Sequence, residues 1–212
     1  MSIIVEELSV SDFDPKTLSE YLSDFYRAYP WNEYLRCPKC SDPDKYDITG
    51  TYGYKDLANQ SEPKCPNCGS DMELFWGEDR SFNYLMNASR KEGFKAFKAI
   101  DTDTGSLVGW VWGYSILPSE LLLPGFEGKS FYLDLICVLK EYRNTRPPIV
   151  GELYLYLLDY LMSDSSYNYL ITRTHKKATN VRRMLIMVGF METGIVSKED
   201  IQRDYWIRPL DE

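Results

Sequence analysis

Residues 131–162 constrain the fold of this chain more than any other stretch. Positions 131–138 form a short, mostly apolar run that predicts a buried strand. Positions 139–146 are charged and lack an apolar period, so they predict a loop. Pro147 and Pro148 then open a predicted helix, since proline at the first helical position sacrifices no hydrogen bond. The helix has one apolar stripe at four-residue spacing, made of Ile149, Leu153, Leu157 and Leu161.

The junction between this loop and this helix suits a phosphate group. Unpaired amides and the positive end of the helix dipole meet at a helix N-terminus, where they favour an anion. Arg143 and Arg146 add side chains that can pair with phosphate oxygens. The pattern therefore predicts a phosphate-binding corner. An ordinary strand–loop–helix corner is the alternative, because short motifs of this kind also occur by chance.

The same stretch resembles the central motif of the GCN5-related N-acetyltransferase (GNAT) family. That family carries Arg/Gln-x-x-Gly-x-Gly/Ala between its fourth strand and its third helix. The run Arg146-Pro147-Pro148-Ile149-Val150-Gly151 is similar to it at the arginine and the last glycine, and Ile149 replaces the first glycine. The preceding Glu141-Tyr142-Arg143 resembles the family's Glu-Tyr-Arg-Gly run, so the loop is longer here than is usual.

The resemblance implies that acetyl-CoA binds along this stretch as a cosubstrate. Its pyrophosphate would lie near Arg143 and Arg146 and would accept hydrogen bonds from amides at the helix start. Proline has no amide proton, so the implied donors are the amides of Ile149, Val150, Gly151 and Glu152. The pantetheine arm would run beside the strand at Ile136 and Val138, where the family splays two strands apart.

Asp134 lies inside the predicted central strand. Buried carboxylates are rare unless they are paired. Desolvation would raise the pKa of this carboxyl toward a value that suits a general base. In the resembling family, an acidic residue on this strand often acts as that base, directly or through water. The alternative is a structural acid that meets water at the sheet face or pairs with an arginine.

The predicted helix 178–187 departs from the family pattern. The family often places a tyrosine there as the general acid for the CoA thiolate, and Leu185 occupies that position here. The family's asparagine falls on Ala178, with Asn180 two positions away. His175, the single histidine, is interpreted as a strand-end residue bonded to backbone rather than as a base.

Four of the five cysteines form two CxxC pairs, Cys37 with Cys40 and Cys65 with Cys68. Two such pairs can bring four thiolates around one zinc ion, which prefers tetrahedral sulfur ligands. Redox chemistry is the alternative, but it is typical of a single CxxC on a βαβ unit. A closed four-cysteine site leaves no open coordination position. We therefore predict structural zinc in a ribbon, with positions 46–51 and 52–54 as its strand-like pieces.

The remaining patterns predict the order of the other elements. Strands are expected at 2–8, 94–100, 107–116, 167–174, 190–196 and 203–209, and helices at 15–28, 79–91 and 178–187. This is the order of the GNAT family with an insert between its first two helices. We predict an α/β fold with a mixed, mostly antiparallel central sheet flanked by helices. The acetyltransferase domain takes residues 1–33 and 76–212, and the zinc-ribbon insert takes residues 34–75.

Charge and hydropathy limit the partners. The formal net charge of −8 disfavours a nucleic-acid backbone and mildly favours a cationic substrate such as an amine. The first residues carry no signal-peptide pattern, and no run reaches the ~20 apolar residues that span a bilayer. We therefore expect a cytoplasmic protein that does not contact a membrane. The sequence does not specify the oligomeric state.

The sequence thus predicts an N-acetyltransferase that moves an acetyl group from acetyl-CoA to an amine. The amine can belong to a protein, a peptide or a small molecule. A non-catalytic module is the main alternative: the same fold would bind CoA, or the zinc ribbon would dock a protein partner. Ile149 and Leu185 favour this alternative because both depart from the family pattern. A zinc-ribbon nucleic-acid binder is a third reading, which the negative charge disfavours.

Overall fold

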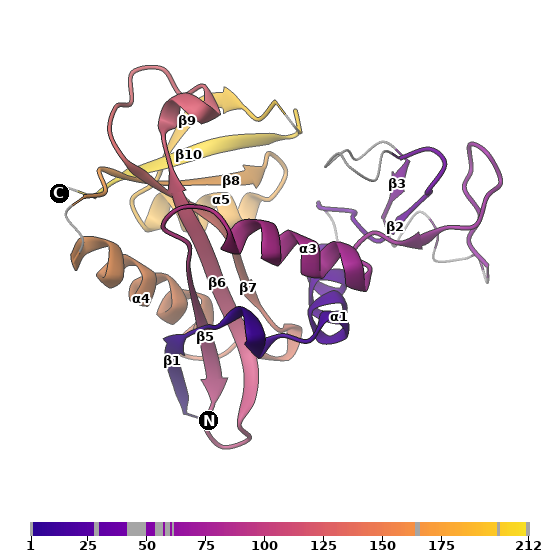
Figure 1. Cartoon of the computed structure of the whole chain (residues 1–212), viewed down its shortest axis with the longest axis horizontal. Helices are drawn as coiled ribbons and strands as arrows, with labels where there is room; N and C mark the ends of the chain where they lie inside the picture. The colour runs from indigo at the N-terminus through magenta and orange to yellow at the C-terminus, as the bar shows by residue number, and fades with distance from the viewer. Residues whose placement is uncertain are drawn as a thin grey trace.

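A computed structural model describes residues 2–27, 30–41, 50–53, 57, 60, 62–163, 166–198 and 200–210. Within these residues the strands form two sheets, one of seven strands and one of three (Figure 1). The large sheet has the order β1-β5-β6-β7-β8-β10-β9. Its strands are β1 (Ile3–Glu7), β5 (Lys95–Asp101), β6 (Ser106–Ile116), β7 (Ser130–Val138), β8 (Tyr169–His175), β9 (Met191–Val196) and β10 (Arg203–Pro209).

All neighbouring strands of the large sheet run antiparallel except β7 and β8, which run parallel. Chain reversal at 101–105 explains one of the antiparallel pairs, because the amides of Thr104 and Gly105 both donate to the carbonyl of Asp101. The predicted mixed, mostly antiparallel sheet is therefore confirmed.

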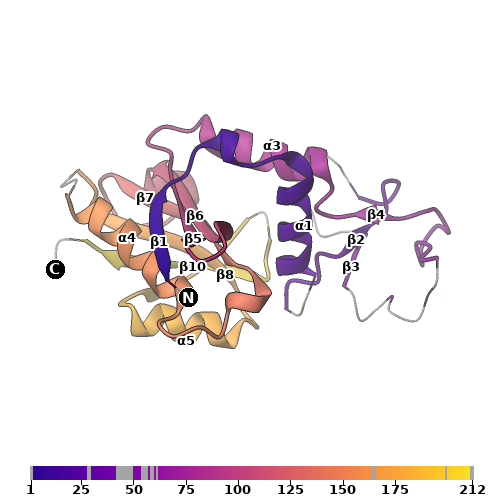
Figure 2. The same cartoon turned by 90° about the horizontal axis from the view of Figure 1, so that it is seen from below.

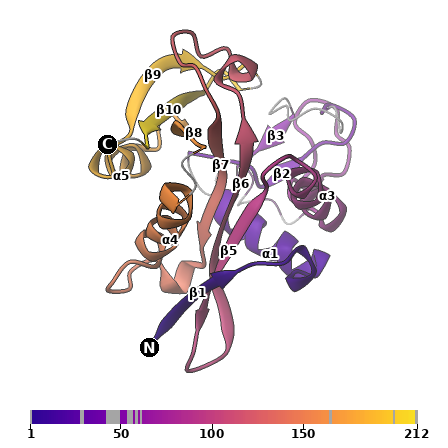
Figure 3. The same ribbon diagram turned by 60° about the vertical axis from the view of Figure 1, so that its left-hand side comes forward.

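Among the described residues, four helices cover the two faces of this sheet: α1 (Pro15–Tyr26), α3 (Glu78–Ser89), α4 (Ile149–Ser163) and α5 (Thr179–Met187). Figure 3 shows α1 and α3 on one face and α4 and α5 on the other. Each face has its own apolar cluster. Trp110 and Trp112 of β6 pack with Leu18 and Leu85 under α1 and α3, whereas the α4 stripe packs on the opposite face. Short 3-10 turns occur at Val10–Asp12, Pro118–Leu121 and Lys140–Tyr142.

The helix starts follow local sequence signals. Asp14 caps α1, because its carboxylate accepts the amides of Lys16 and Thr17 at 3.1 Å each. The first helical residue of α4 is Ile149, directly after the two prolines, and the Arg146–Pro147 peptide bond is cis. Among the helices that the structure describes, none combines the length and the apolar character needed to cross a membrane.

The three-stranded sheet lies to one side, next to α1 and α3 (Figures 1 and 2). Its order is β3-β2-β4, with β2 at Leu35–Arg36, β3 at Thr51–Tyr52 and β4 at Glu73–Leu74. These strands all fall inside the expected insert 34–75. Of the strand-like pieces expected at 46–51 and 52–54, positions 51 and 52 form β3, and positions 46–49 and 54 lie outside the described residues.

Candidate active site and metal centre

The strands β7 and β8 are paired over only part of their length. Their register joins Ser130 to Tyr169 and ends where Leu133 meets Thr172. Beyond that point the two strands have no paired residues, and a cavity of about 340 Å³ lies between them. It is lined by Asp134, Ile136 and Val138 from β7 and by Thr172, Arg173 and Thr174 from β8. The strands therefore separate where the pantetheine arm was predicted to lie, and both apolar residues predicted for it line the cavity.

One end of the cavity reaches the start of α4. Ile149, Val150 and Gly151 line it there. The amides of Gly151 and Glu152 already donate to the carbonyl of Pro148, at 2.9 and 3.2 Å. Amides in the first turn of a helix have no acceptor within the helix, so those of Ile149 and Val150 are the better placed donors for an anion. The Ile149 side chain is buried in the α4 cluster, where it anchors the first turn.

The two predicted arginines differ in their surroundings. The Arg143 guanidinium donates from Nε to the carbonyl of Val138 at 2.9 Å and lies 3.7 Å from Asp24. It also lines the cavity, and its guanidinium lies 5.4 Å from the centre of the Phe25 ring, so it is held at the end of β7. Arg146 is exposed and lies three residues before α4. Arg143 therefore contributes to local structure, and Arg146 is the arginine that can be removed with less effect on the fold.

Asp134 is half-buried on the cavity wall, at an irregular point of β7. Trp112 of β6 is paired with Leu135 and Gly113 with Leu133, so Asp134 is the extra residue of a β-bulge. The Trp112 indole donates to its carboxylate at 3.3 Å, and the Tyr84 hydroxyl also hydrogen-bonds to it. Burial nevertheless raises the pKa of this carboxyl. A carboxylate with a raised pKa, beside the cavity, can accept a proton from an amine near neutral pH.

The wall formed by α5 is apolar at the position where the resembling family often has a tyrosine. Leu185 is buried and lines the cavity, with Asn180 nearby on the same helix. Two cavity tyrosines have hydroxyl groups that are already bonded. The Tyr142 hydroxyl donates to Asp101 at 3.3 Å, and the Tyr154 hydroxyl donates to the carbonyl of Val188 at 3.3 Å. Neither of these two hydroxyl groups therefore replaces the family's tyrosine, whose position Leu185 occupies.

The end of the cavity away from α4 is aromatic. Tyr26 and Trp31 line it there, and Trp31 packs edge-to-face on His175 at 5.9 Å, whereas Phe25 lines the cavity beside Arg143, whose guanidinium lies 5.4 Å from its ring centre. His175 is neutral and structural in this arrangement. Its Nδ1 accepts the amide of Lys177 at 3.0 Å and its Nε2 donates to Gln202 at 3.1 Å, while burial lowers its pKa. The sequence analysis did not identify Trp31 as a cavity residue, because it belongs to no motif.

The four paired cysteines come together in the insert, in segments outside the three short strands. Their sulfur atoms all lie within 4.8 Å of one another, with Cys37 to Cys68 at 3.4 Å and Cys40 to Cys65 at 3.8 Å. Zinc–sulfur bonds of about 2.3 Å in a tetrahedron place the sulfurs about 3.8 Å apart, so the donor set fits zinc. The Gly69 amide donates to the Cys65 carbonyl at 2.8 Å, and Gly69 has a positive φ of 70° that suits a tight turn.

The thiols of the cluster differ in acidity, and hydrogen bonds with Cys68 and Cys37 raise the pKa of Cys40 to about 12. Hydrogen bonds from Ser70 lower the pKa of Cys68 to about 6, which favours the thiolate form that binds a metal. Zinc at this position would hold together two turns and three short strands that have little apolar mass of their own. The four thiolates close the coordination sphere, so the metal would have no position for a substrate.

Comparison with known proteins was informative at the level of structure. No protein-family model matches the sequence, and no curated protein matches it. Solved structures match over nearly the whole chain. NAA60 of Arabidopsis thaliana in complex with acetyl-CoA is 11% identical, covers 100% of both chains and has a TM-score of 0.54. The PaiA N-acetyltransferase of Thermoplasma acidophilum in complex with coenzyme A is 14% identical, covers 99% of both chains and has a TM-score of 0.53.

An acetyltransferase of the GNAT family from Staphylococcus aureus is 15% identical and has a TM-score of 0.52, covering 99% of this chain and 100% of that one. Together with the strand order and the separated β7 and β8, these likenesses establish that the chain has the GNAT acetyltransferase fold. The fold predicted from the sequence is thereby confirmed, and the four-cysteine cluster agrees with the predicted ribbon.

Proposed function

We propose that this protein is an N-acetyltransferase that moves the acetyl group of acetyl-CoA to an amine. The observation that carries the proposal is the cavity between β7 and β8, which runs from the diverging strands to the first turn of α4. Two of the structural neighbours were solved with acetyl-CoA or coenzyme A. The cavity combines apolar walls for the pantetheine arm with a positively charged helix start for the pyrophosphate.

The cavity suggests how acetyl-CoA would lie. The pyrophosphate would be placed at the start of α4, near Arg143 and Arg146 and the amides of Ile149 and Val150. The space beside Gly151 is open, since a Cβ added there would meet no atom within 4 Å. The pyrophosphate would therefore be able to approach the backbone of Gly151 closely. The pantetheine arm would follow Ile136 and Val138. The thioester would then lie near Asp134, farther along the same strand.

The reaction needs a base because an amine is protonated at neutral pH and cannot attack in that form. Asp134 would take the proton from the ammonium, directly or through one water. The freed nitrogen lone pair attacks the thioester carbonyl carbon, the carbon–sulfur bond breaks, CoA leaves as a thiolate, and the new amide nitrogen releases its second proton to water. The thiolate then takes a proton. Leu185 cannot supply this proton, so the source would be water or the proton that Asp134 had accepted.

A non-catalytic CoA-binding module is the second candidate. Leu185 favours it, because an apolar side chain occupies the part of the cavity wall where a proton donor would help. In this reading the fold would bind CoA, and the zinc ribbon would contact a protein partner. The two candidates share cofactor binding and differ only in turnover, so one measurement of each separates them.

For the insert, we propose structural zinc bound by Cys37, Cys40, Cys65 and Cys68. The boundaries 1–33 and 76–212 for the acetyltransferase domain, and 34–75 for the ribbon, belong to the same proposal. Two CxxC pairs kept as thiolates suit a reducing compartment, which supports a cytoplasmic location. The net charge of −8 supports a cationic amine as the acceptor and disfavours nucleic acid.

Thermal melting with and without acetyl-CoA tests the shared part of the proposal. A ligand at 100 times its Kd should stabilise the folded state by about 2.7 kcal/mol. For a chain of this length each kcal/mol corresponds to a rise in Tm of about 2–4 °C. Acetylation of an amine panel, followed by CoA release, then distinguishes the enzyme from the binding module. If acetyl-CoA leaves the Tm unchanged at every concentration up to millimolar, both candidates are wrong.

A further inference from the structure

The two ends of the cysteine insert are joined by one buried carboxylate. Glu33 lies two positions before β2, and Trp76 lies two positions after β4. The Trp76 indole donates to Glu33 Oε2 at 3.0 Å, and the Phe75 amide donates to the carbonyl of Tyr34 at 3.0 Å. Glu33 is only 1% exposed. Its carboxylate therefore closes the base of the insert at a point away from solvent.

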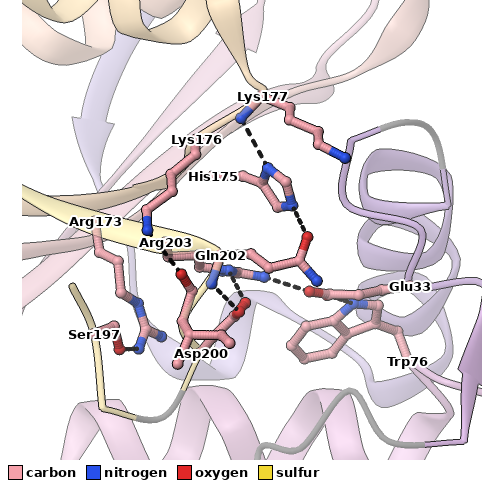
Figure 4. Close-up of polar contacts among 11 residues, drawn as sticks. Glu33, Trp76, Arg173, His175, Lys176, Lys177, Ser197, Asp200, Gln202 and Arg203 are labelled. Atoms are coloured by element: carbon pink, nitrogen blue, oxygen red, sulfur yellow. Dashed lines mark hydrogen bonds and ion pairs between the residues drawn. The ribbon is translucent and has the colours of Figure 1, made fainter.

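The same carboxylate binds an arginine from the far end of the chain. Arg203, the first residue of β10, forms an ion pair with Glu33 Oε1, and its Nε donates to Asp200 at 2.9 Å. Figure 4 shows Glu33 between Trp76 and Arg203, with Asp200 on the other side of the arginine. Glu33 and Arg203 are 170 positions apart in the sequence. One side chain thus ties the insert to the turn between β9 and β10.

This connection sits against the aromatic end of the cavity. The Arg203 guanidinium lies 5.1 Å from the centre of the Trp31 ring, and Tyr26 packs edge-to-face on Trp31 at 5.8 Å. Both aromatic residues line the cavity. Tyr26 also packs on Trp76 at 5.2 Å. The cavity wall formed by Tyr26 and Trp31 therefore packs against Trp76 and Arg203, the two residues that donate hydrogen bonds to Glu33.

We propose that Glu33 is a positioning residue that fixes Trp31, and so the acceptor-side wall of the cavity, by holding Trp76 and Arg203 together. The inference rests on the proposed function in one respect: if acetyl-CoA occupies the end at α4, the acceptor amine must enter at the end lined by Trp31. Burying a carboxylate is costly unless it is paired and hydrogen-bonded. The bonds to Trp76 and Arg203 meet this requirement, and they also fix the geometry of the wall.

Quenching of tryptophan fluorescence by acrylamide measures this directly. Trp31 is half-buried, and the other four tryptophans are each at most 2% exposed, so Trp31 should dominate the quenchable signal. In Glu33→Ala both bonds are lost, and the quenching constant should rise by about twofold as Trp31 leaves its packed position. Glu33→Gln keeps one acceptor oxygen and should show a smaller rise. Trp31→Phe gives the baseline of the buried tryptophans.

Two control variants separate local release from general loss of stability. Leu161→Ala removes a buried side chain from the α4 cluster on the opposite face, and it should lower the Tm without changing the quenching of Trp31. Glu20→Gln removes a carboxylate from an exposed ion pair with Lys16 and should change neither. The Glu33 variants are compared at a temperature where all of them are folded. If Glu33→Ala does not fold at any temperature, the quenching of Glu33→Gln alone tests the inference.

Acetyl-CoA binding, measured by calorimetry on the same variants, keeps this inference separate from the proposed function. Glu33→Gln should bind acetyl-CoA as the wild type does, because Glu33 acts at the other end of the cavity. Wild-type quenching of Trp31 in a folded Glu33→Gln variant would overturn the inference, and so would a loss of acetyl-CoA affinity. If the wild-type protein itself does not bind acetyl-CoA, the proposed function fails, and the quenching still decides whether Glu33 holds Trp31.

Discussion

Replacing Asp134 by asparagine should slow the reaction and yet stabilise the protein at alkaline pH. Burial raises the pKa of this carboxyl in the folded state. The folded protein therefore favours the protonated acid, and the stability that this proton contributes is complete below the pKa of the unfolded chain. It is lost as the pH rises through the raised pKa of the folded state. Above that pH the ionised carboxylate lowers the stability of the fold.

The structure sets the size of this effect and its opposing terms. Each unit by which the folded-state pKa exceeds the unfolded value costs about 1.4 kcal/mol once the carboxyl is ionised. Asparagine has nearly the same shape and carries no charge. Its oxygen can still accept the Trp112 indole, now 3.3 Å from the carboxylate, and the Tyr84 hydroxyl can turn to accept from the new amide. Each kcal/mol gained should raise the Tm by about 2–4 °C.

The assay combines melting curves at intervals from about pH 4 to pH 8 with steady-state rates for an amine that the wild-type protein acetylates. The rate of Asp134→Asn should fall by about 10²–10⁴-fold, and the lower limb of its pH profile should disappear. Its acetyl-CoA affinity should not change. Asp159→Asn, which neutralises an exposed acid on α4, should leave rate, affinity and Tm at wild-type values.

Two results would refute the reasoning in different places. A full rate with an unchanged pH profile would make Asp134 a structural acid, and the base would then be bound water. A Tm difference between Asp134→Asn and wild type that does not grow anywhere between about pH 4, the ordinary pKa of an aspartate, and pH 8 would show that burial does not oppose ionisation here.

Three further predictions concern the metal, the cofactor and the histidine. Purified protein should contain close to one zinc per chain, and Cys65→Ser should lose it; iron, or a folded metal-free protein, would contradict the assignment. Arg146→Ala should weaken acetyl-CoA binding with little change in Tm, whereas Lys16→Ala, at an exposed position on α1, should leave acetyl-CoA binding unchanged. Equal affinities for wild type, Arg143→Ala and Arg146→Ala would rule out the placement of the pyrophosphate. Burial lowers the pKa of His175 in the folded state, so the unfolded histidine takes up a proton at a higher pH than the folded one. The stability of the wild-type protein should therefore decline as the pH falls below about 6.5, and the stability of His175→Asn should decline less over that range.

Much of the fold follows from local patterns. Each of three signals lies within the element that it predicts or directly beside it. They are the apolar run 131–138 for β7, and the prolines before Ile149 and the apolar stripe for α4. The cysteine pairs are also a local signal, because zinc needs four ligands and two CxxC pairs supply four thiolates whatever their separation in the chain. The order of elements predicted from these patterns matches that of the GNAT family, and the likeness to solved structures confirms the fold.

The sequence by itself therefore determined the elements, the cysteine cluster and the strand that carries Asp134. The separation of β7 from β8 was expected from the family resemblance, and the structure shows where the pairing ends. Only the tertiary structure decided the bulge at Asp134 and the place of Trp31 beside His175 and Arg203. These features depend on register and on contacts between distant positions, such as Glu33 with Arg203. No local periodicity encodes such a contact, because burying a charge or displacing a strand is settled by the whole set of neighbours that pack around it.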